Sequence, residues 1–386
     1  MNVLWLVSWF PNRTNPTNGD FIERHARAVA PFVNQLTIIV INKDESMPAG
    51  KVEIDKKQSD NLTVYFVYYG RNKWGKLFEK FFSYKKYITL QHRVFDKIVA
   101  ETGLPDIVHV HVAMKAGVFA HEIKQRYNIP YILTEHWSGY FTESKPNIFD
   151  MGTLYQRMNA MVLKKTSILL PVTRNLGDTI NDNFVKLPFT VVPNVVDTKL
   201  FFYSPSSPPV FTFIHPSYMN YPKNPEGLLE GCRLLKQKGY QFKLFMIGKQ
   251  PPELLALAKS YHLLDEYVFF EDEIPYAEVA KRMQQSSALL MFSRYENLPC
   301  IILEALCCGL PVVSSRVGGV PEVIDDFNGL LVNKDNPAEL AEAMKKIIDN
   351  YTSYQRQLIS EIAITKFSYE VVGKQIKDVY QQVVRK

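Results

Sequence analysis

The 386-residue sequence is poor in cysteine, and its four thiols, at positions 232, 300, 307 and 308, show no CxxC spacing. This scarcity argues against a disulfide scaffold or a zinc site, so we expect reduced, packed thiols. No apolar run approaches the roughly 20 residues that cross a bilayer. The N-terminal MNVLWLVSWFPN lacks a basic stretch and a small-residue cleavage site, which indicates a buried first strand rather than a signal peptide. We therefore predict a cytoplasmic protein.

A strong excess of one charge is also missing. The formal net charge of +6 favours anionic partners without naming one, and no nucleic-acid recognition motif accompanies it. Hydrophobic residues at 46% and charged residues at 22% are ordinary globular values that exclude a disordered chain or a coiled coil. A single core stops growing at roughly 250 to 300 residues, so two domains are expected.

Short runs rich in β-branched and aromatic residues alternate with helical patterns along the whole chain, as in βαβ units. The expected strands are 3–8, 36–41, 62–68, 106–111, 130–135, 167–172, 189–193, 210–215, 242–248, 267–272, 288–293, 311–315 and 329–332. We predict an α/β fold with two Rossmann-like, doubly wound domains, 1–200 and 201–367. The proline- and serine-rich residues 204–210 are the expected hinge, and 368–386 a final helix that could return to the first domain.

Three glutamates interrupt the apolar stretch SRYENLPCIILEALCCGLPVVSSRVGGVPEVI, residues 293–324. The pattern predicts Glu296 in a loop after a strand, and Glu304 on a helix that begins near Pro299 and ends at Gly309. A second helix is expected to begin at Pro321-Glu322.

Helix starts offer free N–H groups to an anion, and the pair Gly318-Gly319 permits close backbone approach. Carboxylates accept hydrogen bonds from vicinal hydroxyls, so the stretch suits a ligand with both diphosphate and sugar, which is a nucleotide-sugar. The alternative is structural: Glu296 and Glu322 would be exposed caps, and Glu304 would pair with a local arginine such as Arg316.

The E-x7-E spacing from Glu296 to Glu304, followed by EALCCGLPVVSSRVGGVPE, resembles the signature of the retaining glycosyltransferases of family 4. Other segments resemble further landmarks of the family in the same order along the chain. WFPNRTNPTNGDFIERHARAVA resembles the family's N-terminal glycine loop and first helix, and DIVHVHVA and ILTEHWSGY resemble its histidine-bearing segments. VVPNVVDTKLF resembles the entry to its hinge. The resemblance implies the GT-B fold, in which two Rossmann-like domains face each other across a cleft. Residues 1–200 would bind the acceptor, and 201–367 the nucleotide-sugar.

The resemblance also implies roles for individual residues. Glu304 would bind the donor ribose, and Glu296 would hold the transferred sugar with the amides of Asn297 and Leu298 nearby. Gly19 would let the backbone approach the diphosphate or the acceptor. The structural alternatives are an exposed cap for Glu296, an arginine partner for Glu304 and a simple turn glycine for Gly19.

Two further residues join Glu296 as catalytic candidates. His136 would contact the transferred sugar near the reaction centre, and Lys223 would balance the departing diphosphate. A packed histidine and a solvated loop lysine are their structural alternatives. Arg316, Gly318 and Gly319 are further candidate phosphate contacts.

The sequence departs from the family pattern at Tyr218, where an arginine five residues before Lys223 is usual, and Arg316 or Arg174 could replace that cation. No D-x-D triplet occurs in the chain, so we expect neither a metal-bridged donor nor another cofactor. A UDP-sugar is the first guess for the donor substrate.

We therefore predict a retaining, metal-independent, hexosyltransferase-type enzyme. It would move a sugar from a nucleotide diphosphate to a hydroxyl of a saccharide or lipid-linked acceptor, in surface polysaccharide or glycolipid synthesis. The alternatives are a GT-B-like sugar-nucleotide epimerase and a catalytically silent binding subunit. A nicotinamide dehydrogenase is set aside because no G-x-G-x-x-G follows the first strand of either half.

Residues 70–97 carry eight Lys or Arg against two acidic residues, with aromatic residues interleaved. Such a helix could lie on an anionic membrane, which would make the protein peripheral on the inner face. An ordinary helix with its aromatic residues in the core is an equal alternative.

Overall fold

The computed structural model describes residues 1–70, 76–205 and 208–385. The chain forms two compact units. The first comprises Met1–Val172, Leu176–Pro193 and Tyr369–Lys386, and the second comprises Thr173–Asn175 and Asn194–Ser368. The predicted hinge, 204–210, lies within the range of the second unit.

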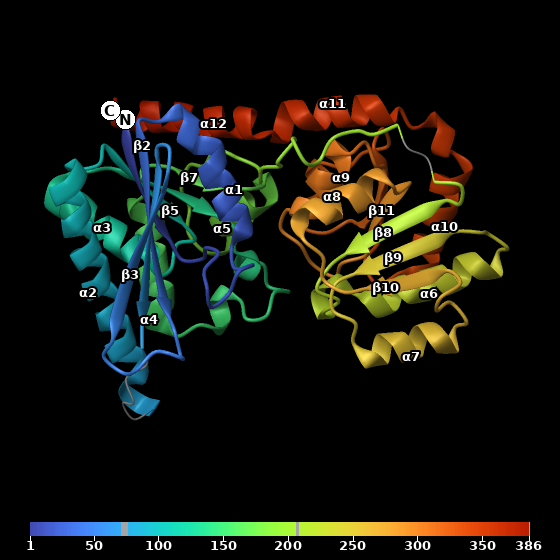
Figure 1. Ribbon diagram of the computed structural model, residues 1–386, viewed down its shortest axis with the longest axis horizontal. Helices are drawn as coiled ribbons and strands as arrows, with labels where there is room; N and C mark the ends of the chain where they lie inside the picture. The colour runs from blue at the N-terminus through green and yellow to red at the C-terminus, as the bar shows by residue number, and fades with distance from the viewer. Residues whose placement is uncertain (71–75, 206–207, 386) are drawn as a thin grey trace. The chain divides into compact units, whose positions relative to one another are not determined.

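The first unit is built on a seven-stranded sheet, coloured from blue to green in Figure 1. The order of its strands is β3-β4-β2-β1-β5-β6-β7. Its strands are β1 (Asn2–Val7), β2 (Gln35–Lys43), β3 (Val52–Ser59), β4 (Leu62–Tyr69), β5 (Ile107–His111), β6 (Tyr131–Glu135) and β7 (Leu169–Pro171). All the pairings are parallel except that of β3 with β4, which is antiparallel. Without β3, the order is that of a doubly wound Rossmann sheet.

Helices α1 (Asp20–Val29), α2 (Lys76–Thr102), α3 (Ala116–Tyr127), α4 (Thr153–Lys165), α5 (Arg174–Asn183) and α12 (Tyr369–Val384) accompany this sheet, with 3₁₀ turns η1 (Ala30–Phe32), η2 (Ser138–Tyr140) and η3 (Ile148–Asp150). The expected final helix is α12, and it packs against α1. A Cβ on Gly373 would lie 2.1 Å from the carbonyl oxygen of Ala28, so the glycine permits this close approach. The buried Trp5 indole donates a 2.9 Å hydrogen bond to the Tyr380 hydroxyl, which ties α12 to β1.

The second unit has a six-stranded, wholly parallel sheet in the order β10-β9-β8-β11-β12-β13. Its strands are β8 (Thr212–Pro216), β9 (Lys243–Ile247), β10 (Val268–Glu271), β11 (Ala288–Met291), β12 (Val312–Ser315) and β13 (Gly329–Val332). Its helices are α6 (Pro225–Gln237), α7 (Pro252–Ser260), α8 (Tyr276–Gln284), α9 (Cys300–Cys307), α10 (Pro337–Asp349) and α11 (Arg356–Phe367), with 3₁₀ turns η4 (Tyr221–Lys223), η5 (Val320–Glu322) and η6 (Tyr351–Ser353). All four cysteines belong to this unit and are free thiols, and only Cys300 is not fully buried.

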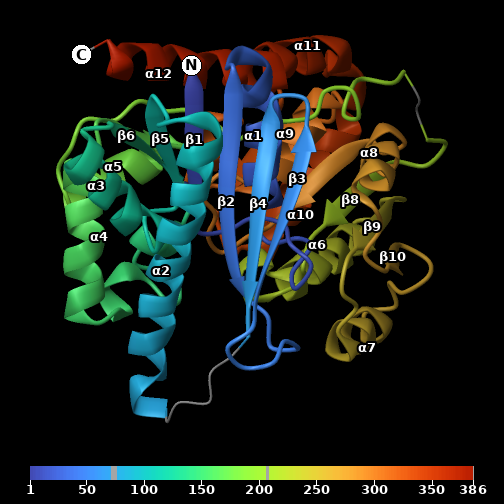
Figure 2. The same ribbon diagram turned by 60° about the vertical axis from the view of Figure 1, so that its left-hand side comes forward.

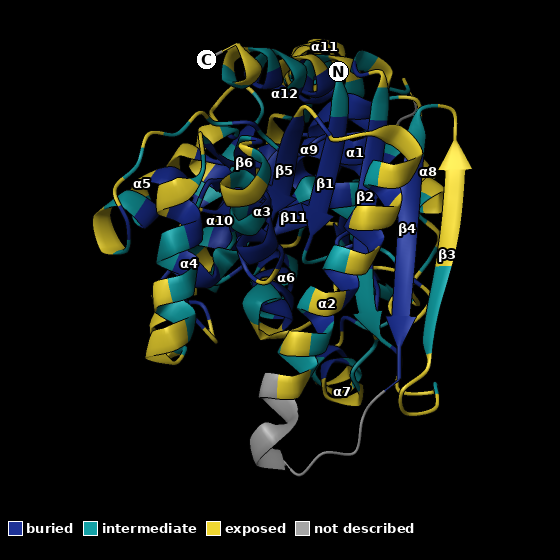
Figure 3. Cartoon of the chain, turned by 90° about the vertical axis from the view of Figure 1, so that its left-hand side faces the viewer, coloured by how far each residue is buried: buried dark blue, intermediate teal, exposed yellow. Residues whose placement is uncertain are grey.

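Every predicted strand except 189–193 is a strand of the structure. Residues 189–193 only run beside β7, where the N–H groups of Thr190 and Val192 donate to Leu169 and Pro171, and that prediction was wrong. The sequence analysis also missed β3. Its residues, VEIDKKQS, are mostly charged or polar and largely exposed at the edge of the sheet (Figure 3), so they lack the apolar signal of an inner strand.

The order of each sheet reverses at one point, between β1 and β5 in the first unit and between β8 and β11 in the second. In open parallel sheets, ligands bind outside the carboxyl ends of the strands at such a switch point. The loops after β8 and β11 are therefore the first place to look for a site in the second unit.

Helix α2 carries most of the predicted basic segment, but residues 71–75 and the side chains of 76–81 lie outside the described part. In the described part, Tyr87 and Phe95 are buried in the core, and Lys85 is exposed. This half of the segment is an ordinary core-facing helix, and membrane attachment stays a prediction. Among the helices as described, none has the length and apolar character needed to span a bilayer.

Candidate active site

An ion pair lies at the switch point of the second unit. Lys223 ends the turn η4 that follows β8, and Glu296 lies in the loop after β11, residues 292–299, named here the Glu296 loop. The Lys223 Nζ is 2.5 Å from Glu296 Oε1, and the Ser293 hydroxyl donates a 2.7 Å bond to the same oxygen. The two charged side chains are 20% and 12% exposed, so they are partly withdrawn from water but remain reachable. The fold thus brings together the two catalytic candidates of this unit.

Arg294 connects the Glu296 loop to the turn that carries Lys223 through hydrogen bonds. Its Nη1 donates to the Tyr221 carbonyl at 2.7 Å, its backbone N–H donates to the Pro222 carbonyl at 2.8 Å, and its Nε donates to Asp335 at 3.1 Å. Sequence reasoning missed this role, although Arg294 stands two residues before Glu296. Tyr218 is 51% exposed. An arginine at that position would therefore lie at the surface of the loop between β8 and η4.

Glu304 is 3% exposed, on the second turn of α9. The Tyr276 hydroxyl donates a 2.6 Å hydrogen bond to Glu304 Oε1, and the Tyr276 ring packs against Phe201 at a centroid distance of 4.9 Å. A tyrosine at the start of α8 is thus one partner of Glu304. No pattern in the sequence pointed to Tyr276, which stands 28 residues from Glu304.

The two glycines after β12 pack directly on the Glu296 loop. Gly318 has φ of +52°, and a Cβ there would lie 1.8 Å from the carbonyl oxygen of Glu296. A Cβ on Gly319 would meet Thr173 Cγ2 at 2.1 Å, and its N–H donates to the Asn297 carbonyl at 2.9 Å. The pair therefore has a packing role, whether or not it also contacts phosphate. Arg316 is exposed beside it.

The predicted helix at Pro321-Glu322 was wrong. The residues form only the three-residue turn η5, which has no helical N-terminus to offer to an anion. The Glu322 carboxylate instead accepts the backbone N–H groups of Arg174 at 2.8 Å and Asn175 at 2.7 Å. It is thus an exposed cap, as the structural alternative proposed, but it caps the start of α5, 147 and 148 positions away in the sequence.

The other residues of the Glu296 loop are held where the chain enters the second unit. The Asn297 side-chain oxygen accepts from the Thr173 hydroxyl at 3.0 Å, and the Leu298 carbonyl accepts from the Asn194 amide at 2.8 Å. Asn297 and Leu298 are both buried. The loop conformation is therefore fixed before any ligand arrives, which favours tight, pre-organised binding.

Replacement of Gly318 with alanine tests this packing. We expect Gly318→Ala to destabilise the second unit by more than the about 1–2 kcal/mol that a left-handed backbone costs an L-residue, because the Glu296 carbonyl must also move. Gly239→Ala is the matched control, since Gly239 has φ of +83° and nothing within 4 Å of the added Cβ. Urea unfolding measures both losses, and equal losses would contradict the packing role.

In the first unit, His136 follows β6 and is 8% exposed. Its Nε2 lies 3.3 Å from His111 Nδ1, and the Phe21 ring packs on it at 4.8 Å. The preceding Glu135 is fully buried and accepts the backbone N–H groups of Ala113, His136 and Trp137 at 2.9–3.1 Å. Burial raises the pKa of Glu135, and these hydrogen bonds oppose the rise. Glu135 thus orients the backbone that carries His136, a role that sequence reasoning did not assign.

A cluster of four buried histidines surrounds this position: His25, His109, His111 and His136. His109 is held between the Tyr380 and Thr134 hydroxyls, both at 2.7 Å. Burial and the neighbouring histidines lower the pKa of His109 and of His111 well below the ordinary value, so both are neutral at pH 7. In the described part of the chain, no group of three or more His, Cys, Asp or Glu side chains is arranged to hold a metal ion.

Gly19 precedes α1 with φ of +68°, a conformation that favours glycine. A Cβ at this position would lie 2.8 Å from Trp9 Cβ and 3.1 Å from the Phe10 nitrogen. The turn therefore requires a glycine for its own geometry, and contact with a diphosphate or an acceptor stays a prediction.

Comparisons with known proteins agree with this arrangement. A family profile described as Glycosyltransferase Family 4 matches residues 56–200, and one described as Glycosyl transferases group 1 matches residues 199–363. Together, the two matches run from the first unit through the glutamate motif of the second. The chain belongs to glycosyltransferase family 4. This confirms the predicted family, and the enzyme is a glycosyltransferase.

Individual relatives of this glycosyltransferase extend over its full length. A Bacillus subtilis glycosyltransferase assigned to teichuronic acid biosynthesis is 21% identical, over 99% of this chain and 98% of its own. Sucrose-phosphate synthase from Thermosynechococcus elongatus has a similar structure, with a TM-score of 0.79, 17% identity and complete coverage of both chains. HepE from Anabaena, solved in complex with UDP, has a TM-score of 0.71 and 16% identity, over 99% of this chain and 100% of its own. These likenesses confirm the GT-B fold.

Proposed function

We propose that this glycosyltransferase transfers a sugar, with retention of anomeric configuration and without a metal, from a nucleotide diphosphate donor to a hydroxyl of a saccharide or lipid-linked acceptor. The observation that carries the proposal is the Lys223–Glu296 pair, 2.5 Å apart at the carboxyl ends of β8 and β11. An ammonium beside a carboxylate at that position suits a ligand with a diphosphate at one end and sugar hydroxyls at the other.

In the proposed reaction, the bond between the anomeric carbon and the diphosphate oxygen breaks as the acceptor oxygen bonds to the same carbon on the same face. The proton of the acceptor hydroxyl passes to the departing diphosphate. The ammonium of Lys223 would stabilise the negative charge that develops on the leaving group, and Glu296 would hold hydroxyls of the sugar. His136 of the first unit would contact the transferred sugar. The absence of a D-x-D triplet from the sequence supports a metal-independent reaction.

The second buried glutamate supports a nucleotide donor. Tyr276 holds one oxygen of Glu304 at 2.6 Å, which fixes the carboxylate for paired hydrogen bonds from vicinal hydroxyls such as those of a ribose. The UDP complex of HepE supports UDP as the first nucleotide to test. Asn297, Leu298 and Gly19 would contact the donor, and Arg316, Gly318 and Gly319 its phosphates.

The biological role that fits this chemistry is surface polysaccharide or glycolipid synthesis. The relative assigned to teichuronic acid biosynthesis, which covers nearly the whole chain, supports this choice. A cytoplasmic location, with peripheral attachment to the inner face of the membrane, belongs to the same proposal.

Product analysis tests the proposed function. The protein is incubated with UDP-glucose, UDP-N-acetylglucosamine or UDP-galactose, each alone and with a panel of saccharide and lipid-linked acceptors, and the products are followed by NMR. We expect a new glycoside, whose anomeric proton matches the configuration of the donor, only when an acceptor is present. An altered donor without an acceptor would indicate the epimerase. Nucleotide binding without any turnover would indicate the silent subunit, which the tyrosine at position 218 favours.

A further inference from the structure

The loop between β1 and α1, residues 8–19, is named here the Gly19 loop. It begins at the carboxyl end of β1, and its middle part, residues 13–17, is exposed. The end of the loop is fixed, because the turn at Gly19 packs closely on Trp9 and Phe10. An exposed stretch of chain samples many conformations unless another part of the protein holds it. The middle of the loop therefore needs an anchor if the Gly19 turn is to meet a ligand in one conformation.

Asn12 gives the loop an internal turn. Its backbone exchanges hydrogen bonds of 3.2 Å with Asn15 in both directions. Its side-chain oxygen accepts from the Thr14 hydroxyl at 2.6 Å and from the N–H groups of Thr14 and Asn15 at 3.0 and 3.2 Å, and its amide donates to the Phe10 carbonyl at 2.9 Å. Because these partners all belong to the loop, they shape the turn without attaching it to the sheet.

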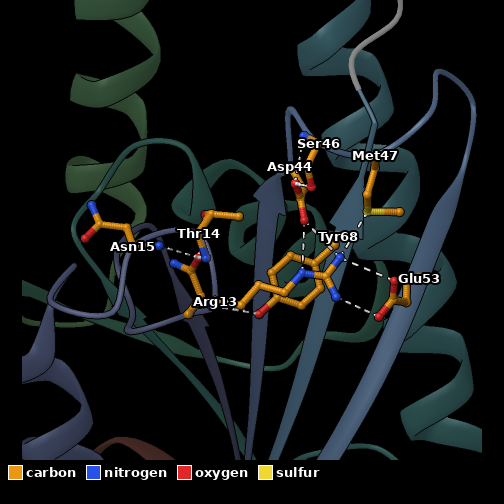
Figure 4. Close-up of polar contacts among 9 residues, drawn as sticks. Arg13, Thr14, Asn15, Asp44, Ser46, Met47, Glu53 and Tyr68 are labelled. Atoms are coloured by element: carbon orange, nitrogen blue, oxygen red, sulfur yellow. Dashed lines mark hydrogen bonds and ion pairs between the residues drawn. The ribbon is translucent and has the colours of Figure 1, made fainter.

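Arg13 attaches this turn to the sheet (Figure 4). Its Nη1 donates to Glu53 Oε1 at 2.7 Å, and its Nε donates to Asp44 Oδ2 at 2.9 Å. Its Nη2 donates to the Met47 sulfur at 3.2 Å. The guanidinium lies 3.8 Å from the centre of the Tyr68 ring, and the Arg13 backbone N–H donates to the Tyr68 hydroxyl at 3.2 Å. One residue of the loop thus contacts the segment after β2, strand β3 and strand β4.

The register of the sheet explains why these partners meet. Glu53 of β3 lies directly opposite Tyr68 of β4, and Asp44 follows Lys43, the last residue of β2, which lies opposite Tyr69. Figure 2 shows β2, β4 and β3 side by side at the edge of the sheet. Since β1, β2 and β4 are parallel, the Gly19 loop and the partners of Arg13 lie at the same, carboxyl, end of the sheet. Ligands of open parallel sheets bind at this end.

Two observations favour positioning of the loop over stabilisation of the edge strand. Strand β3 pairs with β4 over its whole length, Val52–Ser59, and so does not depend on Arg13 for its place in the sheet. The Asp44 side chain is only 7% exposed, and its other oxygen accepts from the Ser46 N–H at 3.0 Å and from the Ser46 hydroxyl at 2.6 Å. The carboxylate that receives Arg13 is therefore itself held in place, and the anchor is charge-assisted.

We propose that Arg13 is a positioning residue, which holds the Gly19 loop in the conformation that receives the donor. This inference rests on the proposed function, in which Gly19 contacts the donor, and it adds a residue that does not touch the substrate. Because Arg13 orders the loop on folding, the donor does not have to order it on binding. Arg13 therefore strengthens donor binding and takes no part in the chemical step.

Steady-state kinetics of the full chain test this role, with whichever of UDP-glucose, UDP-N-acetylglucosamine and UDP-galactose supports transfer. We expect Arg13→Ala to raise the KM for the donor by about tenfold, the cost of ordering about one residue of backbone at binding, and to change kcat by less than about twofold. Arg13→Lys keeps the charge but not the forked contacts and should lie in between. Arg27→Ala, the matched control, removes the same charge from an exposed ion pair with Glu23 on α1 and should leave both constants unchanged.

Hydrogen exchange of the Gly19 loop gives a second readout, which needs no turnover. We expect the amides of residues 12–18 to exchange faster in Arg13→Ala than in wild type or in Arg27→Ala. Glu53→Ala, whose wild-type side chain is 44% exposed, should act in the same direction. The double variant Arg13→Ala/Glu53→Ala should exchange no faster than Arg13→Ala alone, because both changes remove one anchor.

The inference is overturned if Arg13→Ala lowers the melting temperature but leaves the KM for the donor unchanged, since Arg13 would then serve stability alone. It is also overturned if Arg27→Ala raises that KM equally, or if the loop amides exchange alike in wild type and Arg13→Ala. Absence of turnover by the wild type would contradict the proposed function itself, and hydrogen exchange would then decide separately whether Arg13 anchors the loop.

Discussion

Replacing Lys223 with alanine should lower the rate of sugar transfer by about a hundredfold to a thousandfold, the usual loss when a group that stabilises charge in the transition state is removed. Two effects add. The leaving diphosphate loses its cation, and Glu296, which Lys223 contacts at 2.5 Å, loses the partner that orients it. The measurement is the initial rate of glycoside formation with donor and acceptor at saturation.

Two variants make the result for Lys223 interpretable. Lys223→Arg keeps the positive charge and should retain more activity than the alanine variant. The planar guanidinium of arginine differs in shape from the compact ammonium of lysine, so we do not expect full activity. Lys259→Ala removes the same charge from an exposed position at the end of α7 and should change the rate by less than about twofold, as expected of a screened surface charge. If Lys223→Ala retains nearly the wild-type rate, Lys223 is a solvated loop residue with no part in the reaction.

Acid should destabilise the second unit through His215. This histidine is fully buried, with its Nδ1 at 2.8 Å from the Leu290 carbonyl and its Nε2 at 2.9 Å from the Ser217 hydroxyl. Burial lowers its pKa from 6.5 to about 4. The unfolded chain therefore takes up a proton first, so stability is present above pH 6.5 and is lost as the pH falls toward 4. The loss amounts to about 3 kcal/mol of unfolding free energy for this one group.

Urea unfolding between pH 7.5 and 4 measures this dependence. His215→Gln removes the titrating group and should flatten the profile, whereas His262→Gln, at an exposed position, should not. In the first unit, His109 and His111 act in the same direction as His215. The raised pKa of Glu135 acts in the opposite direction, since it favours the folded state at low pH. Parallel profiles for wild type and His215→Gln would contradict the role of His215.

Most strands of both sheets were predictable because inner parallel strands are near-continuous apolar runs, which β11, with the sequence ALLM, illustrates. Strand β3 was not predicted because it is an exposed edge strand with many charged residues, and it therefore lacks the apolar pattern of an inner strand. The turn η5 was predicted to be a helix because Pro321 and Glu322 suit a helix start. The close packing of Gly318 and Gly319 on the Glu296 loop was not predicted, because it is a tertiary contact that no local pattern reveals.

The same limit applies to the site. Glu296, Glu304 and Lys223 could be chosen from motif spacing, but their partners could not. Lys223 meets Glu296 across 73 positions of the sequence. Tyr276 meets Glu304, and Arg294 binds the turn at Tyr221, through loop packing that follows from the strand order of the folded sheet.

The most direct test of nucleotide-sugar binding by the second unit is thermal unfolding with UDP, GDP, ADP, TDP and CMP in turn, on wild type, Glu304→Ala and the exposed control Glu273→Ala. A nucleotide at 100 times its dissociation constant stabilises the folded state by about 2.7 kcal/mol, which a melting curve resolves. We predict that one nucleotide raises the midpoint of wild type and of Glu273→Ala, and that Glu304→Ala abolishes the rise. No rise with any nucleotide, or a rise that survives in Glu304→Ala, would contradict the assignment of Glu304 to the donor.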